Sequence, residues 1–150
     1  MRKLFMGTGE IALPSFRMMA QEGDLAGLVT QPDRPVGRSA KPCPPRIKEV
    51  AAGFGVPVVQ PEKVREEEGY AAVAALEPDL IVVMAYGQIL PRELLEMPRF
   101  GCINVHASLL PRHRGASCIQ AAIEAGDPET GISIIYMKED LDTGDVITRQ

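Results

Sequence analysis

The chain has 150 residues, a formal net charge of −4 and an ordinary apolar content, which predicts one globular domain or part of one. The negative charge argues against a nucleic-acid-binding surface over the whole molecule, and no apolar run is long enough to cross a bilayer. Strand-like residues follow directly after Arg2 and Lys3, so we expect no signal or transit segment and a cytoplasmic location. The three cysteines lack C-x-x-C spacing, which argues against a disulfide framework or a zinc site.

The first predicted strand, Lys3 to Met6, leads into Gly7–Ala12, which has the G-x-G-x-x-A outline of a dinucleotide-binding turn. Dinucleotide binding also requires an acidic residue at the end of the second strand. That strand, predicted over 25–30, is followed by Gln31 and Pro32, and Asp33 lies beyond them in a loop. We therefore expect no NAD, and an anion or a carbonyl group is the alternative ligand for the amides of this turn.

The next segment, residues 31–45, reads QPDRPVGRSAKPCPP and is too rich in proline for regular structure. Loops of this length within compact α/β units are often functional. Basic residues gather in and after it, opposed only by two acids, and they either form a solvated surface or meet a phosphate backbone. The basic residues are Arg34, Arg38, Lys41, Arg46 and Lys48.

The rest of the chain alternates between helices and strands. Helices are predicted over 46–54, 70–76, 91–97 and 117–125, and strands over 56–59, 79–87, 101–106 and 130–138. This order predicts a Rossmann-like α/β fold, in which helices flank a mostly parallel sheet and ligands bind at the carboxyl ends of the strands. The turn EDLDTGD then leads into VIT, which predicts a hairpin and an antiparallel last strand.

The candidate chemistry lies in INVHASLLPRHRG, residues 103–115. Asn104 and His106 are two apart on a strand and so project to the same face near its carboxyl end. A buried polar pair needs partners, so we expect the pair to face a cleft. An asparagine amide can hold a developing oxyanion, and a histidine can carry a proton near neutral pH. The alternative is a histidine that is merely hydrogen-bonded at a strand edge.

A carboxylate from the following turn would orient the histidine. Asp142 is the candidate, and Asp140 and Asp145 are its rivals. A metal site built from His106, His113 and Asp142 is disfavoured, because His113 lies in a basic Arg-His-Arg turn and no H-x-x-x-H pair is present. A serine hydrolase is disfavoured because the chain lacks G-x-S-x-G.

These motifs together resemble the formyltransferase family that uses 10-formyltetrahydrofolate. Asn-x-His, S-L-L-P and L-D-T-G-D occur in the family's order and spacing, and the likeness runs over the whole chain, although Ala107 stands where glycine is expected. The resemblance implies a formyl transfer that needs neither a metal nor NAD. It implies that Asn104, His106 and Asp142 are catalytic, and that folate contacts Ser108, Leu109, Leu110, Pro111, Gln88, Ile89 and Leu90.

Two further stretches, TQPDRPVGR and VMAYGQILP, are similar to the branch of the family that formylates methionyl initiator tRNA. This likeness implies tRNA contacts by Arg34, Arg38 and Lys41, and we expect a monomer. Members of that branch are longer and end in a tRNA-gripping β-barrel, so residues 1–150 are expected to be an N-terminal catalytic part. The other functions considered are a formyltransferase acting on an amino-sugar nucleotide, a formyltetrahydrofolate hydrolase, and an inactive domain that binds folate or RNA.

Overall fold

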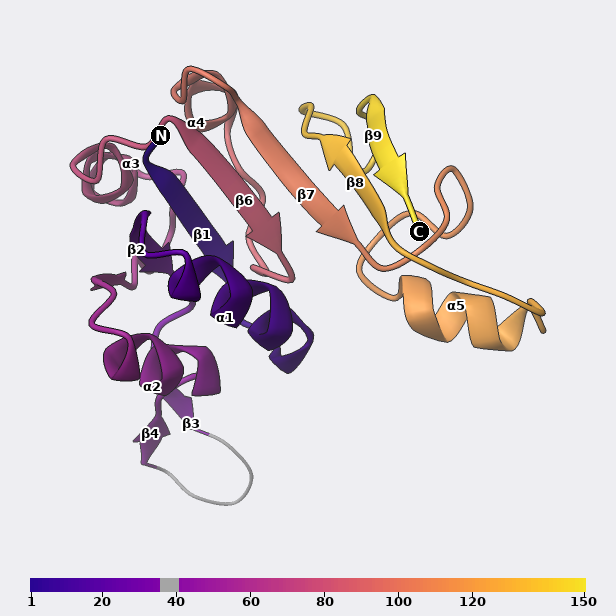
Figure 1. Cartoon of the computed structure of the whole chain (residues 1–150), viewed down its shortest axis with the longest axis horizontal. Helices are drawn as coiled ribbons and strands as arrows, with labels where there is room; N and C mark the ends of the chain where they lie inside the picture. Colours follow the sequence, from indigo (N-terminus) through magenta and orange to yellow (C-terminus); the bar gives the residue numbers. More distant parts are fainter. Residues whose placement is uncertain (36–40) are drawn as a thin grey trace.

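The computed structural model describes residues 1–35 and 41–150. Seven strands form one twisted sheet in the order β5-β2-β1-β6-β7-β8-β9 (Figure 1). The five strands from β5 to β7 are parallel to one another, β8 is antiparallel to β7, and β9 is antiparallel to β8. The strands are β1 (Lys3–Gly7), β2 (Leu25–Val29), β5 (Val58–Val59), β6 (Leu80–Met84), β7 (Cys102–His106), β8 (Ser133–Tyr136) and β9 (Val146–Arg149).

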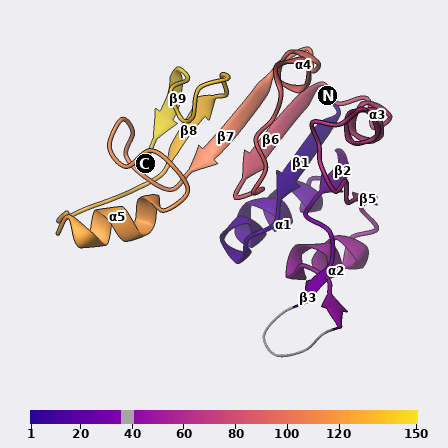
Figure 2. The same cartoon turned by 180° about the vertical axis from the view of Figure 1, so that it is seen from behind.

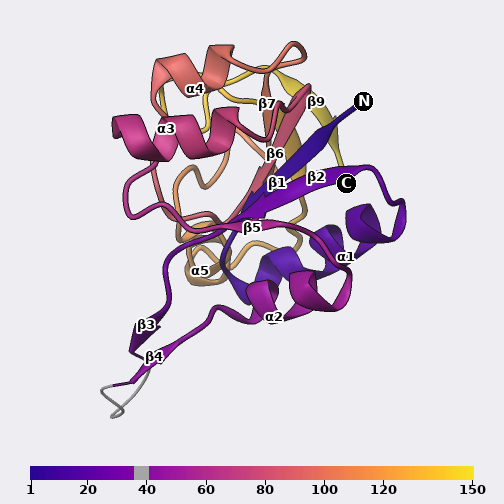
Figure 3. The ribbon, with the colours of Figure 1, turned by 90° about the vertical axis from the view of Figure 1, so that its left-hand side faces the viewer.

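Helices cover both faces of the sheet, as the predicted Rossmann-like fold requires. Figure 3 shows α1 and α2 on one side of the strands and α3 and α4 on the other. The strands alternate between these layers: Leu4 and Met6 pack with the α3 and α4 side, and Phe5 packs with the α1 and α2 side. The helices are η1 (Glu10–Ala12), a 3-10 turn, then α1 (Leu13–Gln21), α2 (Arg46–Gly53), α3 (Glu67–Ala74), α4 (Arg92–Glu96) and α5 (Cys118–Glu124). None of them, within the described residues, has the length and apolar character of a membrane span.

The antiparallel part of the sheet contains two strand pairings, one more than the sequence predicts. The predicted hairpin is confirmed, because β9 pairs antiparallel with β8. However, β8 itself opposes β7, with Ile103 opposite Tyr136 and His106 opposite Ser133, although a helix separates the two strands. The reason is the position of α5, which lies beyond the carboxyl end of β7 rather than across a sheet face (Figures 1 and 2). The chain re-enters the sheet at the end where it left, so β8 runs in the opposite direction.

The segment 31–45 was expected to have no regular structure, and this expectation is wrong in part. Strands β3 (Arg34–Pro35) and β4 (Pro42–Cys43) form a short antiparallel pair in which Arg34 lies opposite Cys43. Each strand is only two residues long and includes a proline, which lacks the N–H that a longer ladder would use. This pair lies apart from the main sheet, next to α2 (Figure 1).

Tyr86 provides a test of this packing. Its side chain is 2% exposed within the α3 and α4 core layer, and its hydroxyl has no hydrogen-bond partner among the described residues. Burial accordingly raises the pKa of Tyr86. We expect Tyr86→Phe to leave the free energy of unfolding unchanged or to raise it by about 1 kcal/mol, because it removes a buried donor without a partner. Urea denaturation checks this, with Tyr136→Phe, a change at a half-exposed residue, as the neutral control. A loss of more than about 1 kcal/mol would contradict it.

Candidate active site

Three predicted catalytic side chains meet at the carboxyl end of β7. The Asn104 Nδ2 atom donates a hydrogen bond to the Asp142 Oδ1 atom at 3.3 Å. The His106 Nδ1 atom lies 3.6 Å from the Asp142 Oδ2 atom, and both side chains are 7% exposed. Of the three carboxylates considered from the sequence, Asp142 is therefore the one that reaches the Asn104 and His106 pair. Asp145 is exposed and pairs with Lys138 at 3.3 Å.

The position of the Asp142 carboxylate is set by the backbone as well as by Asn104. Asp142 has a φ of +52°, a left-handed conformation that turns the chain sharply after β8. The Gly115 N–H donates to its Oδ2 atom at 2.8 Å. The carboxylate thus accepts two hydrogen bonds and faces the imidazole, which is an arrangement that holds an ionised acid in place.

The His106 ring is held from both sides. Its Nε2 atom lies 2.9 Å from the carbonyl oxygen of His113. A carbonyl only accepts, so Nε2 carries a hydrogen and donates. The Nδ1 atom then faces Asp142, at a distance longer than a hydrogen bond. The Nδ1 atom is therefore the ring nitrogen with capacity left for a reacting group.

A cavity of about 600 Å³ adjoins these three residues. The segment after β6, the end of β7, the start of α5 and the turn after β8 line it, and several of its walls are apolar, including Ile11, Ile135 and Leu141. A cavity of this size with apolar walls and a few polar groups suits a ligand with a flat ring.

Only some of the predicted folate residues line the cavity. Gln88, Ile89 and Leu90 line the cavity. The Gln88 side chain, however, accepts from the Val64 N–H at 2.8 Å and donates to the Glu62 carbonyl at 3.2 Å. Its amide therefore supports the loop before α3, which leaves the backbone of Gln88 to face a ligand.

The tetrapeptide Ser108–Pro111 is not among the residues that line this cavity. The Ser108 hydroxyl donates to the Arg112 carbonyl at 2.7 Å. The Ser133 hydroxyl donates to the Ser108 carbonyl at 2.7 Å and accepts from the Leu110 N–H at 3.0 Å. These buried contacts fix the backbone of the tetrapeptide behind His106, and its contact with folate stays a prediction.

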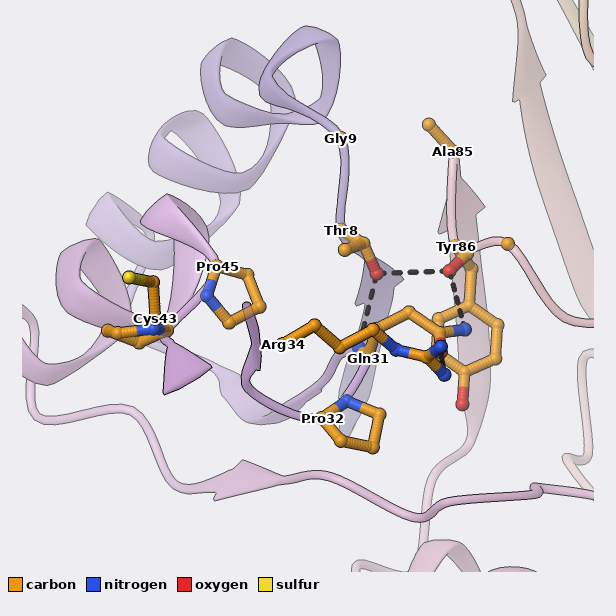
Figure 4. Close-up of a pocket in the computed structure, with 11 residues that line it drawn as sticks. Thr8, Gly9, Gln31, Pro32, Arg34, Cys43, Pro45, Ala85 and Tyr86 are labelled. Carbon is orange, nitrogen blue, oxygen red and sulfur yellow. Dashed lines mark hydrogen bonds between the residues drawn. The ribbon is translucent and has the colours of Figure 1, made fainter. Parts of the chain in front are cut away.

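A second pocket, of about 550 Å³, lies between the turn after β1 and the segment around β3 and β4 (Figure 4). The Tyr86 carbonyl accepts from the Thr8 hydroxyl at 3.0 Å and from the Gln31 side-chain amide at 3.1 Å. The G-x-G-x-x-A turn thus helps to join the ends of β1, β2 and β6. Arg34 lines this pocket, and Ala85–Gly87 line both pockets. Arg38 lies outside the described residues, and Lys41 is exposed.

Asp33, the acid that follows the second strand β2, is already paired. Lys48 Nζ lies 2.8 Å from its Oδ1 atom, and Gln60 donates to the same atom at 2.7 Å. These contacts, that of Lys48 above all, hold the pKa of Asp33 below its usual range. In the part of the chain that the structure describes, no three His, Cys, Asp or Glu side chains are grouped as metal ligands would be.

A formyl transferase family model matches residues 6–150. The chain belongs to the formyl transferase family. It is 57% identical over 149 residues to the methionyl-tRNA formyltransferase of Akkermansia muciniphila and 53% identical over 150 residues to that of Bacillus mycoides. Each alignment covers 99% of this chain and 48% of the relative, so the chain spans about half the length of these curated relatives.

Solved structures of two formyltransferases share the fold of this chain. Glycinamide ribonucleotide transformylase 1 from Geobacillus kaustophilus is 30% identical, with a TM-score of 0.74 over 100% of this chain and 81% of that one. Phosphoribosylglycinamide formyltransferase from Streptococcus pneumoniae TIGR4 is 25% identical, with a TM-score of 0.75 over 99% of this chain and 79% of that one. The predicted family and the predicted Rossmann-like sheet are therefore confirmed.

The candidate site also contains groups that sequence reasoning missed. The Gly115 N–H and the His113 carbonyl contact Asp142 and His106 directly. Both are backbone groups, which every residue carries, so no side-chain motif could have identified them. The only sequence signal was their position in the R-H-R-G turn, where glycine often adopts a left-handed conformation, and Gly115 has a φ of +94°.

Proposed function

We propose that this formyl transferase transfers the formyl group of 10-formyltetrahydrofolate to the amino group of methionyl initiator tRNA. The observation that carries the proposal is the cluster of Asn104, His106 and Asp142, which lines the 600 Å³ cavity and includes the buried imidazole of His106. The high identity to proteins named methionyl-tRNA formyltransferase supports the acceptor. No metal or NAD takes part in this reaction.

The chemistry follows from the groups present. The acceptor amine attacks the formyl carbon, and negative charge develops on the formyl oxygen. The Asn104 amide has a second N–H besides the one given to Asp142, and protonated His106 can donate from Nδ1, so both can stabilise this oxyanion. The bond from the formyl carbon to N10 then breaks. N10 gains a proton while the amine loses one, and His106 with Asp142 moves that proton.

The two pockets suggest which substrate binds where. In this proposal folate occupies the larger apolar cavity, and the amine arrives along the smaller pocket, where Arg34 is positioned to meet a phosphate or a base. The wall common to both, Ala85–Gly87, then lies between the two substrates. The exposed guanidinium of Arg34 in the smaller pocket favours a nucleic acid as the acceptor. An amino-sugar nucleotide is the second candidate acceptor, because it also carries phosphate.

Formyl transfer measured with three acceptor conditions tests the proposal. The protein is given 10-formyltetrahydrofolate with methionyl-tRNA, with an amino-sugar nucleotide, or with water alone. Because the chain spans about half of its relatives, the assay uses the chain alone and the chain followed by the remaining residues of the A. muciniphila relative. We expect formyl-methionyl-tRNA as the product. Preferential formylation of the sugar, or release of formate without an acceptor, would replace the proposed function.

Arg34 tests the acceptor side of this proposal. We expect Arg34→Ala to raise KM for methionyl-tRNA by about tenfold and to leave KM for 10-formyltetrahydrofolate unchanged, because one charge-assisted contact is lost. Arg99→Ala is the matched control, since Arg99 lies between α4 and β7 and lines neither pocket. An equal change in both KM values would contradict a specific contact of Arg34 with the tRNA.

A further inference from the structure

Behind the catalytic histidine, Asp127 joins two consecutive side chains of the R-H-R-G turn. One carboxylate oxygen lies 2.6 Å from the His113 Nε2 atom, and the other accepts from the Arg112 Nη2 atom at 2.6 Å. The Asp127 side chain is 8% exposed and the His113 side chain 15%. The contact with His113, and then the charge of Arg112, hold the pKa of Asp127 below its usual range, so the acid is ionised at neutral pH.

Asp127 is itself firmly placed. It follows α5, and its backbone N–H donates to the Ala122 carbonyl of that helix at 3.1 Å. The carboxylate is therefore attached to the end of a helix rather than to a free loop. A carboxylate placed in this way can fix the positions of its partners, Arg112 and His113, and of the backbone that carries them.

The backbone of the same turn contacts both groups proposed to move protons. The His113 carbonyl accepts from the His106 Nε2 atom at 2.9 Å, and the Gly115 N–H donates to the Asp142 Oδ2 atom at 2.8 Å. His113 itself has a φ of +56°. This left-handed conformation costs free energy for a residue with a Cβ atom, and the contact of the His113 side chain with Asp127 can offset that cost.

We propose that the Asp127–His113 pair is a positioning clamp for His106. The pair holds the left-handed backbone of residue 113, so that its carbonyl binds Nε2 of His106 and leaves Nδ1 toward Asp142 and the substrate. The clamp rests on the proposed role of His106 in formyl transfer. Asp127 and His113 are positioning residues, because they act through the ring of His106 and line neither pocket.

Kinetics provide the first test. Asp127→Asn keeps the shape of the side chain and removes its charge. We expect kcat to fall by about tenfold or more, because the His106 imidazole, which moves the proton in the proposed reaction, is displaced. We expect KM for 10-formyltetrahydrofolate to change by less than about twofold, because the residues that line the larger cavity are unchanged. Glu129→Gln is the matched control, since it removes an exposed acid two residues away. His113→Gln retains a donor at the position of Nε2 and is expected to recover most of the activity that His113→Ala loses, because alanine, unlike glycine, keeps the cost of the left-handed backbone.

Imidazole ¹⁵N NMR spectroscopy provides the second test, which does not require activity. The chain has only two histidines, His106 and His113, so two imidazole signal sets are expected and His113→Gln assigns them. In the unmodified protein His106 should carry a hydrogen on Nε2. In Asp127→Asn the Nδ1–H tautomer of His106 should become populated, because the carbonyl acceptor is no longer held in place.

The outcomes separate the clamp from the proposed function. An unchanged His106 spectrum in Asp127→Asn overturns the clamp, even if kcat falls, because the loss would then be merely structural. A shifted tautomer supports the clamp even if no acceptor is formylated. Should Asp127→Asn fail to fold, Asp127→Glu and His113→Gln, which retain the paired groups, are compared by the same spectra. Wild-type His106 spectra and kcat in both His113→Ala and His113→Gln would also overturn it.

Discussion

Replacing Asp142 with asparagine is expected to lower kcat for formyl transfer by about a thousandfold. The asparagine keeps the shape of the side chain, but it removes the charge that faces the His106 imidazole at 3.6 Å. It also presents an N–H either to the Gly115 N–H or to the Asn104 amide, which both donate to the carboxylate. Steady-state kinetics with saturating substrates measure the loss.

The same hairpin contains a matched control. Asp145→Asn removes an exposed acid three residues away that pairs only with Lys138 in the described structure. We expect this variant to stay within about twofold of the parent kcat. A large loss in Asp145→Asn, or near-normal activity in Asp142→Asn, would contradict the assignment of Asp142.

Gly144→Ala is expected to destabilise the protein by about 3 kcal/mol or more. A Cβ atom at this position would overlap the carbonyl oxygen of Tyr136 on the facing strand. That oxygen belongs to the backbone and cannot swing away, so the β8–β9 turn must shift. Because Asp142 lies in this turn, the variant should also lose formyl transfer under conditions where it stays folded.

Gly53→Ala is the matched control for this variant. Gly53 is the last residue of α2, and among residues 1–35 and 41–150 no heavy atom outside its own helix backbone and chain neighbours lies within 4 Å of the position of its Cβ atom. Alanine favours the helix, so we expect the free energy of unfolding to be unchanged or raised by about 0.5 kcal/mol. Urea denaturation compares the two variants directly. Equal stability of both would mean that the hairpin can widen at Gly144 without cost.

The sequence predicted those features that depend on side-chain pattern. The two-residue period places Asn104 and His106 on one face, and the alternation of strands and helices predicts the parallel sheet. The direction of β8 was missed because it depends on where α5 sits, which no local pattern records. The hydrogen bond from the Val64 N–H to the Gln88 side chain was also missed, because the two residues are distant in the sequence.

The wall common to the two pockets has a consequence for how this protein can change. Ala85 has a φ of +49° and Gly87 a φ of +88°, and the Ala85 carbonyl accepts from the N–H groups of Thr8 and Gly9. The turn after β1 therefore holds this short partition in place. Space gained on one side of a fixed partition is lost on the other. In the proposed function each pocket holds one substrate. A larger side chain at position 85 would improve the fit of the substrate in one pocket and reduce the space for the substrate in the other. The specificities for the two substrates would therefore not evolve independently.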